Sequence, residues 1–258
     1  MCTQARVSSP LYAEWCRRLD LAPLFNRKHW EYAYAAAVLV DLGAADDGRR
    51  GLGFGVGREP LPAYLASRGC SVVATDQPAG AGDAARWAST GEYAGSLEGL
   101  ARPNVCEVDA FRQRVSFRPV DMTDVPGDLN GFDFCWSLCA MEHLGSLEAG
   151  LHFVERSLDC LRPGGVAVHT TELNLSSDVS TLDGGTTVLY RKRDLESLVA
   201  QLEAGGHKVA PLDLDTGDGV LDAYVDGPPW IDWPGRPVLR VDVEGFVTTS
   251  FALVVTAS

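Results

Sequence analysis

The residues best suited to chemistry are acids and a histidine that follow apolar, β-branched runs. Asp76, Asp121 and Glu172 each come at the end of such a run, and Glu142 and His143 follow another. Parallel strands of an α/β sheet present their carboxyl ends at one edge, where ligands bind. We therefore expect these five side chains to gather around one site.

A histidine at that edge suits proton transfer, because its unperturbed pKa lies near the operating pH. His143 is therefore the candidate general base for an attacking oxygen or nitrogen, and Glu142 either orients it or binds a substrate hydroxyl. The pair can instead simply cap a helix and line the pocket. Glu172 is a further catalytic candidate, and the candidate substrate-binding residues are Trp30, Asn174 and Tyr190.

A metal site is the other chemistry that these residue types allow. Carboxylates and imidazoles at Glu142, His143, His169 and Glu172 could ligate a metal ion. Their spacing is not the tight spacing of a metal motif, so we expect no metal. His169 is expected to point into the packing of the sheet.

A glycine-rich stretch from Gly51 to Gly57 precedes all of these residues. Alternate glycines allow positive φ and a close approach of the backbone to a ligand. Asp76 lies about 20 residues beyond the loop, which is where a nucleotide-binding α/β unit places its ribose-binding acid. The stretch has no Gly-Lys-Ser/Thr, so it is not a P-loop, and dinucleotide and S-adenosylmethionine binding both remain open.

The surrounding pattern alternates strands with helices, which predicts a mostly parallel sheet covered on both faces. Residues 1–50 have helical spacing, and they either pack against the sheet or cover the site. The last residues read as an antiparallel hairpin around Glu244 and Gly245. Before it lies a Gly- and Pro-rich surface insertion with Trp230 and Trp233, while Trp87 either packs in the core or borders an adenine.

Composition narrows the class of partner. The 258 residues carry a formal net charge of −13, which argues against a broad nucleic-acid or anionic-membrane surface. Seven scattered cysteines fit free thiols in a reducing compartment, and no apolar run is long enough for a signal core or a membrane span. We expect a cytoplasmic protein with a small-molecule substrate. The sequence leaves the oligomeric state open, and a homodimer is compatible with it.

Taken together, these motifs resemble a class I S-adenosylmethionine-dependent methyltransferase of the methyltransferase type 11 kind, over roughly residues 48–173. The run Leu161–Gly165 matches that family's turn into its fifth strand. The resemblance implies S-adenosylmethionine as cofactor, with the methionine part at Gly53, Gly55 and Gly57 and near Ser137 and Leu138, the ribose at Asp76 with Gln77, and the adenine at Asp121 with Met122.

The chain departs from the family two residues before the first loop glycine. The family usually has an acid there, and this chain has Gly51. Glu59 or a group from the N-terminal helices could hold the cofactor's ammonium instead. Arg58 either holds the cofactor's carboxylate at the helix N-terminus or makes a surface salt bridge.

The resemblance implies an α/β, Rossmann-like class I methyltransferase fold with a mostly parallel seven-stranded sheet, an antiparallel C-terminal hairpin and N-terminal helices. Residues 1–258 would form a single domain, divided into a helical lid (1–48), a cofactor-binding core (49–212), an insertion loop (213–236) and the hairpin (237–258). The predicted reaction is methyl transfer to oxygen or nitrogen of a small-molecule, sugar or natural-product acceptor.

Two alternatives are retained. The first is a nucleotide-dependent oxidoreductase, against which count the absence of a Tyr-x-x-x-Lys pair and the antiparallel ending. The second is a non-catalytic S-adenosylmethionine-binding protein, which the departure at Gly51 would suit.

Overall fold

The computed structural model describes residues 1–78, 80, 93–228 and 235–258. Trp87, Trp230 and Trp233, considered above as core, adenine or acceptor contacts, lie outside these residues. All structural statements below concern the described part of the chain.

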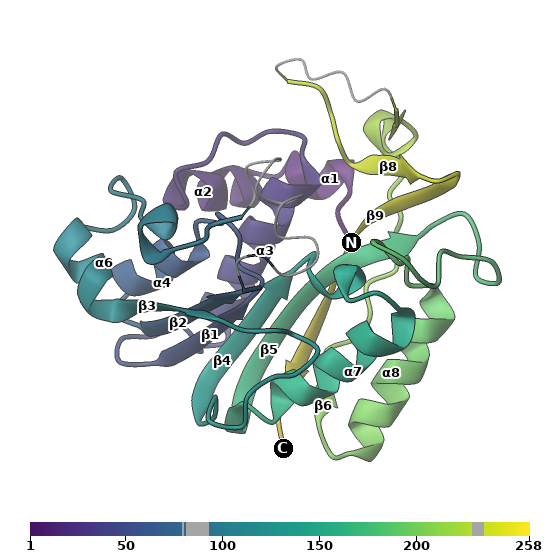
Figure 1. Ribbon diagram of the computed structural model, residues 1–258. Helices are drawn as coiled ribbons and strands as arrows, with labels where there is room; N and C mark the ends of the chain where they lie inside the picture. Colours follow the sequence, from purple (N-terminus) through teal and green to yellow (C-terminus); the bar gives the residue numbers. More distant parts are fainter. Residues whose placement is uncertain (79, 81–92, 229–234) are drawn as a thin grey trace.

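A single sheet organises the molecule, with strand order β3-β2-β1-β4-β5-β9-β8-β7 and β6 paired to β9 (Figure 1). The strands are β1 Arg50–Phe54, β2 Ser71–Asp76, β3 Val115–Pro119, β4 Phe132–Leu138, β5 Leu161–Asn174, β6 Lys208–Val209, β7 Val225–Asp226, β8 Arg240–Val243 and β9 Phe246–Thr256.

The first five strands are parallel, and the last long strand reverses direction. β9 pairs antiparallel with β5 from Val166↔Thr256 to Asn174↔Thr248. The hairpin turn between β8 and β9 uses positive φ at Glu244 (52°) and Gly245 (89°), as a tight hairpin requires. The predicted fold class is confirmed, and the described chain has nine strands rather than seven because β7 and β8 extend the sheet beyond β9.

Helices cover both faces of the sheet (Figure 1). The described helices are α1 Gln4–Val7, α2 Pro10–Arg18, α3 Arg27–Asp41, α4 Leu61–Ser67, α6 Val108–Arg114, α7 Leu147–Leu158 and α8 Lys192–Ala204, with short 3₁₀ turns η1 Leu97–Leu100, η2 Met141–His143 and η3 Val220–Asp222. None of the described helices is long and apolar enough to cross a bilayer.

Alternating residues of the central strands supply the two sides of the core. On β4, Cys135 packs with the apolar residues of α7 and α8. Phe134 and Trp136 pack on the opposite side with those of α3, α4 and α6. Burial on both faces explains why these strands read as continuous apolar runs.

The N-terminal helices are held by helix caps from neighbouring residues and by a hydrophobic cluster of their own. Asn26 begins α3, and its Oδ1 accepts hydrogen bonds from the backbone N–H of Lys28 (2.8 Å) and His29 (3.3 Å). Trp15 and Trp30 are buried in the cluster formed by α2 and α3. This start places the first turn of α3 beside the carboxyl ends of β4 and β5.

Candidate functional site

A cavity of about 880 Å³ opens at the carboxyl ends of the parallel strands. Its wall combines the glycine-rich loop, the ends of β2 and β4, the first turns of α3 and the segment 185–187. The volume lies in the upper part of the range for small-molecule sites, so it can take two small ligands side by side.

The glycine-rich loop approaches the far wall closely at Gly55. Its φ is +58°, and a Cβ there would lie 2.9 Å from the Cβ of Ala140 and 3.2 Å from Sδ of Met122. Any other residue would be strained and would fill the space beside the cavity. Gly57 also has positive φ (+48°), and its N–H donates to Oδ2 of Asp76 at 3.1 Å.

Asp76 at the end of β2 is a buried acid with backbone donors. Its Oδ1 accepts a hydrogen bond from the N–H of Gln77 at 2.8 Å. Burial raises the pKa of Asp76, and the backbone hydrogen bonds oppose that rise. Asp121, on the same cavity wall, is exposed, and its Oδ1 accepts from the N–H and hydroxyl of Thr123 at 2.8 and 2.7 Å.

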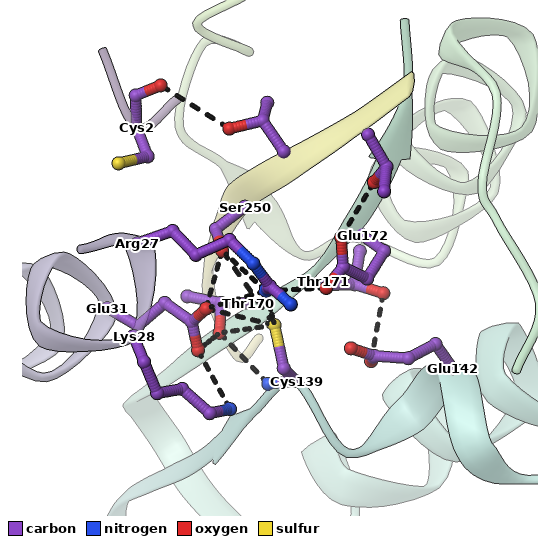
Figure 2. Close-up of polar contacts among 12 residues, drawn as sticks. Cys2, Arg27, Lys28, Glu31, Cys139, Glu142, Thr170, Thr171, Glu172 and Ser250 are labelled. Carbon is purple, nitrogen blue, oxygen red and sulfur yellow. Dashed lines mark hydrogen bonds and ion pairs between the residues drawn. The ribbon is translucent and has the colours of Figure 1, made fainter. Parts of the chain in front are cut away.

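The floor of the cavity is a cluster of buried acids and half-buried cations that joins α3 to the sheet (Figure 2). Nη1 of Arg27 lies 2.5 Å from Oε1 of Glu172, and Nζ of Lys28 lies 3.3 Å from Oε2 of Glu31. The thiol of Cys139 donates to Oε1 of Glu31 at 3.1 Å. Buried charges require such partners, because an unpaired charge inside a protein is very costly.

Glu142 is the acid of this floor with unused bonding capacity. It is fully buried, and its Oε2 accepts from the hydroxyl of Thr171 at 3.1 Å (Figure 2). Its Oε1 has no hydrogen-bond partner among the described residues. Burial raises the pKa of Glu142, with a further rise from the negative charge of Glu172.

His143 follows on the same 3₁₀ turn and also lines the cavity. Its Nδ1 lies 2.9 Å from the carbonyl oxygen of Thr186 and 3.3 Å from the hydroxyl of Thr187. A carbonyl oxygen only accepts, so in the neutral ring Nδ1 carries the hydrogen and Nε2 the lone pair. The segment 186–187 therefore helps to orient this ring through Nδ1.

The possible metal ligands that lie close together are not the four considered from the sequence. Ligand atoms of Cys139, Glu142 and Glu172 lie within 4.8 Å of one another. The guanidinium of Arg27 already neutralises Glu172 there. His169 is remote from this group, between the hydroxyls of Ser137 (2.8 Å) and Ser157 (3.1 Å), and burial lowers its pKa to about 4.

Most of the residues expected at the site line this one cavity. They are Gly55, Gly57, Arg58, Asp76, Gln77, Asp121, Met122, Leu138, Glu142, His143 and Glu172. The cavity also contains residues that the sequence did not single out as site residues, including Arg27, Lys28, Tyr32, Cys139, Thr186 and Thr187. The Asn26 cap was the available signal for the first two, because it fixes where α3 begins.

Five expected site residues lie outside the cavity lining. Gly53 belongs to β1, Ser137 is bonded to His169, and Trp30 stacks on Tyr34 in the N-terminal core. The two remaining candidates support neighbouring backbone. The hydroxyl of buried Tyr190 donates to the carbonyl of Met141 (3.3 Å), and Asn174 bonds the backbone of Ser176, Ser177 and Ser180.

No protein-family model and no curated protein matches the chain. Solved structures do match its fold. A putative sarcosine dimethylglycine methyltransferase from Galdieria sulphuraria has a TM-score of 0.56 at 15% identity, over 88% of this chain and 84% of that one. Magnesium protoporphyrin IX methyltransferase from Synechocystis PCC 6803 with bound SAH has 0.52 at 13%, over 95% and 94%. The N-terminal domain of EvdMO1 with SAH bound has 0.50 at 14%, over 88% and 81%. These likenesses confirm the expected class I methyltransferase fold.

Proposed function

We propose that the protein is an S-adenosylmethionine-dependent methyltransferase that acts on oxygen or nitrogen of a small-molecule acceptor. One observation carries this proposal: a single cavity joins the glycine-rich loop and Asp76 to Glu142 and His143. The fold, shared with structures that hold SAH, supports the same assignment.

The loop side of the cavity fits the cofactor. Gly55 leaves space that a Cβ would fill, and Asp76 is a buried acid at the strand end, where a ribose would lie. Asp121 and Met122 line the same wall on the adenine side. When bound, S-adenosylmethionine supplies a methyl group on a positively charged sulfur.

The opposite side of the cavity would hold the acceptor. The unpaired Oε1 of Glu142 would accept a hydrogen bond from a hydroxyl or amine of the acceptor, which a buried acid needs. His143, with its lone pair on Nε2, would take the proton that the acceptor loses. The first turns of α3 close this side and would limit the access of water.

The chemistry of this lining favours a polar acceptor. Arg27, Glu142 and Glu172 line the cavity, and the hydroxyls of Thr186 and Thr187 join them. Such groups recognise hydroxyls and amines of a sugar or a small polar metabolite. The net charge of −13 disfavours a nucleic acid as acceptor.

Calorimetric titration with S-adenosylmethionine, SAH and NAD in parallel tests the proposal. Binding of the two adenosyl compounds alone is the expected result. Transfer of labelled methyl from S-adenosylmethionine would then be screened over sugars, amines and phenols. Binding of NAD alone would instead indicate an oxidoreductase, and cofactor binding without transfer to any acceptor would indicate a non-catalytic binding protein.

A further inference from the structure

Glu59 is another buried acid of the cavity, on the loop side. It follows the glycine-rich loop, and its N–H donates to the carbonyl of Val56 at 3.2 Å. The residue is 3% exposed and lines the cavity. Its Oε1 accepts a hydrogen bond from Nε1 of Trp136, and the described residues offer it no ion pair. Burial raises the pKa of Glu59 to about 8.

Trp136 connects this carboxylate to β1. A Cβ built on Gly53 would lie 2.8 Å from Cε2 of the indole, the ring atom bonded to Nε1. The ring therefore packs against Gly53 while its N–H holds Glu59. Through Trp136 the acid is thus linked to β1, although it comes from the turn that precedes α4.

β1 itself has no room for an acid at position 51. A Cβ on Gly51 would lie 2.4 Å from the ring of Phe134 on the neighbouring strand. A carboxylate side chain there would displace that buried ring. Glu59 is the cavity-lining acid that is bonded to Trp136, the residue of β4 that packs against Gly53.

Lys28 supplies a positive charge to the same cavity. Its Nζ donates to the carbonyl of Leu138 at 3.0 Å and pairs with Glu31 at 3.3 Å. An ammonium has three donors, so these contacts leave one for a ligand. Lys28 is close enough to Glu59 to oppose the rise in its pKa.

An acid and a lysine on one cavity wall match a zwitterionic α-amino acid group. On the proposed cofactor, we infer that Glu59 accepts the α-ammonium of its amino-acid end and that Lys28 faces the α-carboxylate. Of the other cavity acids, Glu142 is assigned above to the acceptor, and Asp121 is bonded to Thr123. Glu172 is paired with Arg27 and Thr248, and Asp76 with the backbone of Gly57 and Gln77.

The variant Glu59→Gln tests this assignment, because a glutamine Oε1 can still accept from Trp136. Calorimetry would compare SAH with 5′-methylthioadenosine, which lacks the amino-acid group. SAH should bind the variant about 10- to 100-fold more weakly than the wild type, since a charge-assisted hydrogen bond is lost. The affinity for 5′-methylthioadenosine should not change.

Glu142→Gln is the matched control, because it removes a second buried acid of the same cavity. We expect it to leave the affinity for SAH unchanged. The inference would be overturned if Glu59→Gln weakened the binding of both ligands equally. It would also be overturned if Glu142→Gln alone weakened the binding of SAH selectively. A wild-type protein that binds neither ligand would instead overturn the proposed function.

Proton release from the wild-type protein tests the same point without a variant. The charged groups near Glu59 are Lys28 and Glu31 from α3 and Asp76 from β2. Burial favours the protonated form of Glu59, and an ammonium ligand would favour its ionised form. Titrations in buffers of different ionisation enthalpy should therefore show proton release with SAH and none with 5′-methylthioadenosine. Equal proton release with both would contradict the inference.

Discussion

The acids of the cavity differ in how many hydrogen-bond donors the protein already supplies to their carboxylate oxygens. Glu172 is saturated by Arg27 and Thr248, whereas Glu142 keeps one oxygen without a partner among the described residues. Glu59 has a single indole donor. Because a buried oxygen needs a donor, the proposed acceptor and cofactor would supply the donors that Glu142 and Glu59 lack.

At the residue scale, Asp76→Ala should weaken SAH binding by about 1–3 kcal/mol, through the loss of ribose hydrogen bonds. Asp121→Ala is the matched comparison. Its carboxylate is exposed and already bonded to Thr123, so we expect a smaller loss. Calorimetry measures both, with thermal unfolding as the check on folding. Unchanged affinity in a folded Asp76→Ala protein would refute the placement of the ribose.

His143→Gln should lower kcat about 10²- to 10⁴-fold if the imidazole is the general base. SAH affinity should stay the same, because the ring lies on the acceptor side. His152→Gln, at an exposed position of α7, is the control and should keep full activity. Full activity in His143→Gln as well would leave His143 as a residue that only lines the cavity.

At the scale of elements, β1 and β4 fit together because glycines on β1 lie beside large aromatic side chains on β4. Gly51 faces the ring of Phe134, and Gly53 faces the indole of Trp136. The two aromatic rings stack at 6.0 Å between centroids. The glycines of β1 are thus required by packing.

Gly51→Ala should therefore lower the free energy of unfolding by about 1–3 kcal/mol, as overpacking of a filled core does. Gly127→Ala is the control, because a Cβ at this exposed glycine meets nothing within 4 Å. Urea denaturation of both variants and the wild type measures the difference. Equal stability of the two variants would show that Phe134 moves aside at little cost.

At the scale of the whole molecule, contacts between distant segments hold the N-terminal part against the sheet. Glu31 accepts from the hydroxyls of Thr170 (3.1 Å) and Ser250 (2.5 Å). Arg240, 2% exposed, donates to the carbonyls of Cys2 (2.8 Å) and Thr216 (2.5 Å). These contacts make the start of the chain, the insertion and the hairpin one unit.

Global unfolding should also depend on pH through His169. Its pKa is about 4 in the folded protein and about 6.5 when exposed, so the unfolded state binds the proton first. The stabilising contribution is complete above pH 6.5 and is lost as the pH falls toward 4, by about 3 kcal/mol. Glu59, with its raised pKa, acts in the opposite direction between pH 4.5 and 8.

The measurement is the difference in unfolding free energy between wild type and His169→Gln as the pH is lowered. The difference isolates the histidine, because Glu59 is common to both proteins. We expect the wild type to lose stability relative to the variant between pH 6.5 and 4. Parallel curves would mean that the imidazole is protonated in the folded protein.

Local and topological rules were enough to predict the fold class and much of the cavity wall. Apolar runs gave the central strands, and the end of a parallel strand is a fixed place, so Asp76, Asp121 and Glu172 could be placed from order alone. The predicted hairpin is also present. Short strands with few apolar residues, such as β7, carry no pattern that a sequence can reveal.

Only the tertiary structure decided which side chains meet. Trp136 and Glu59 are 77 positions apart, and the residues bonded to Glu31 include Cys139 and Ser250. It also placed Trp30 and Tyr190 in packed interiors, outside the lining of the cavity. Periodicity shows that a residue is buried but not what it is buried against, because that depends on how elements distant in sequence pack together.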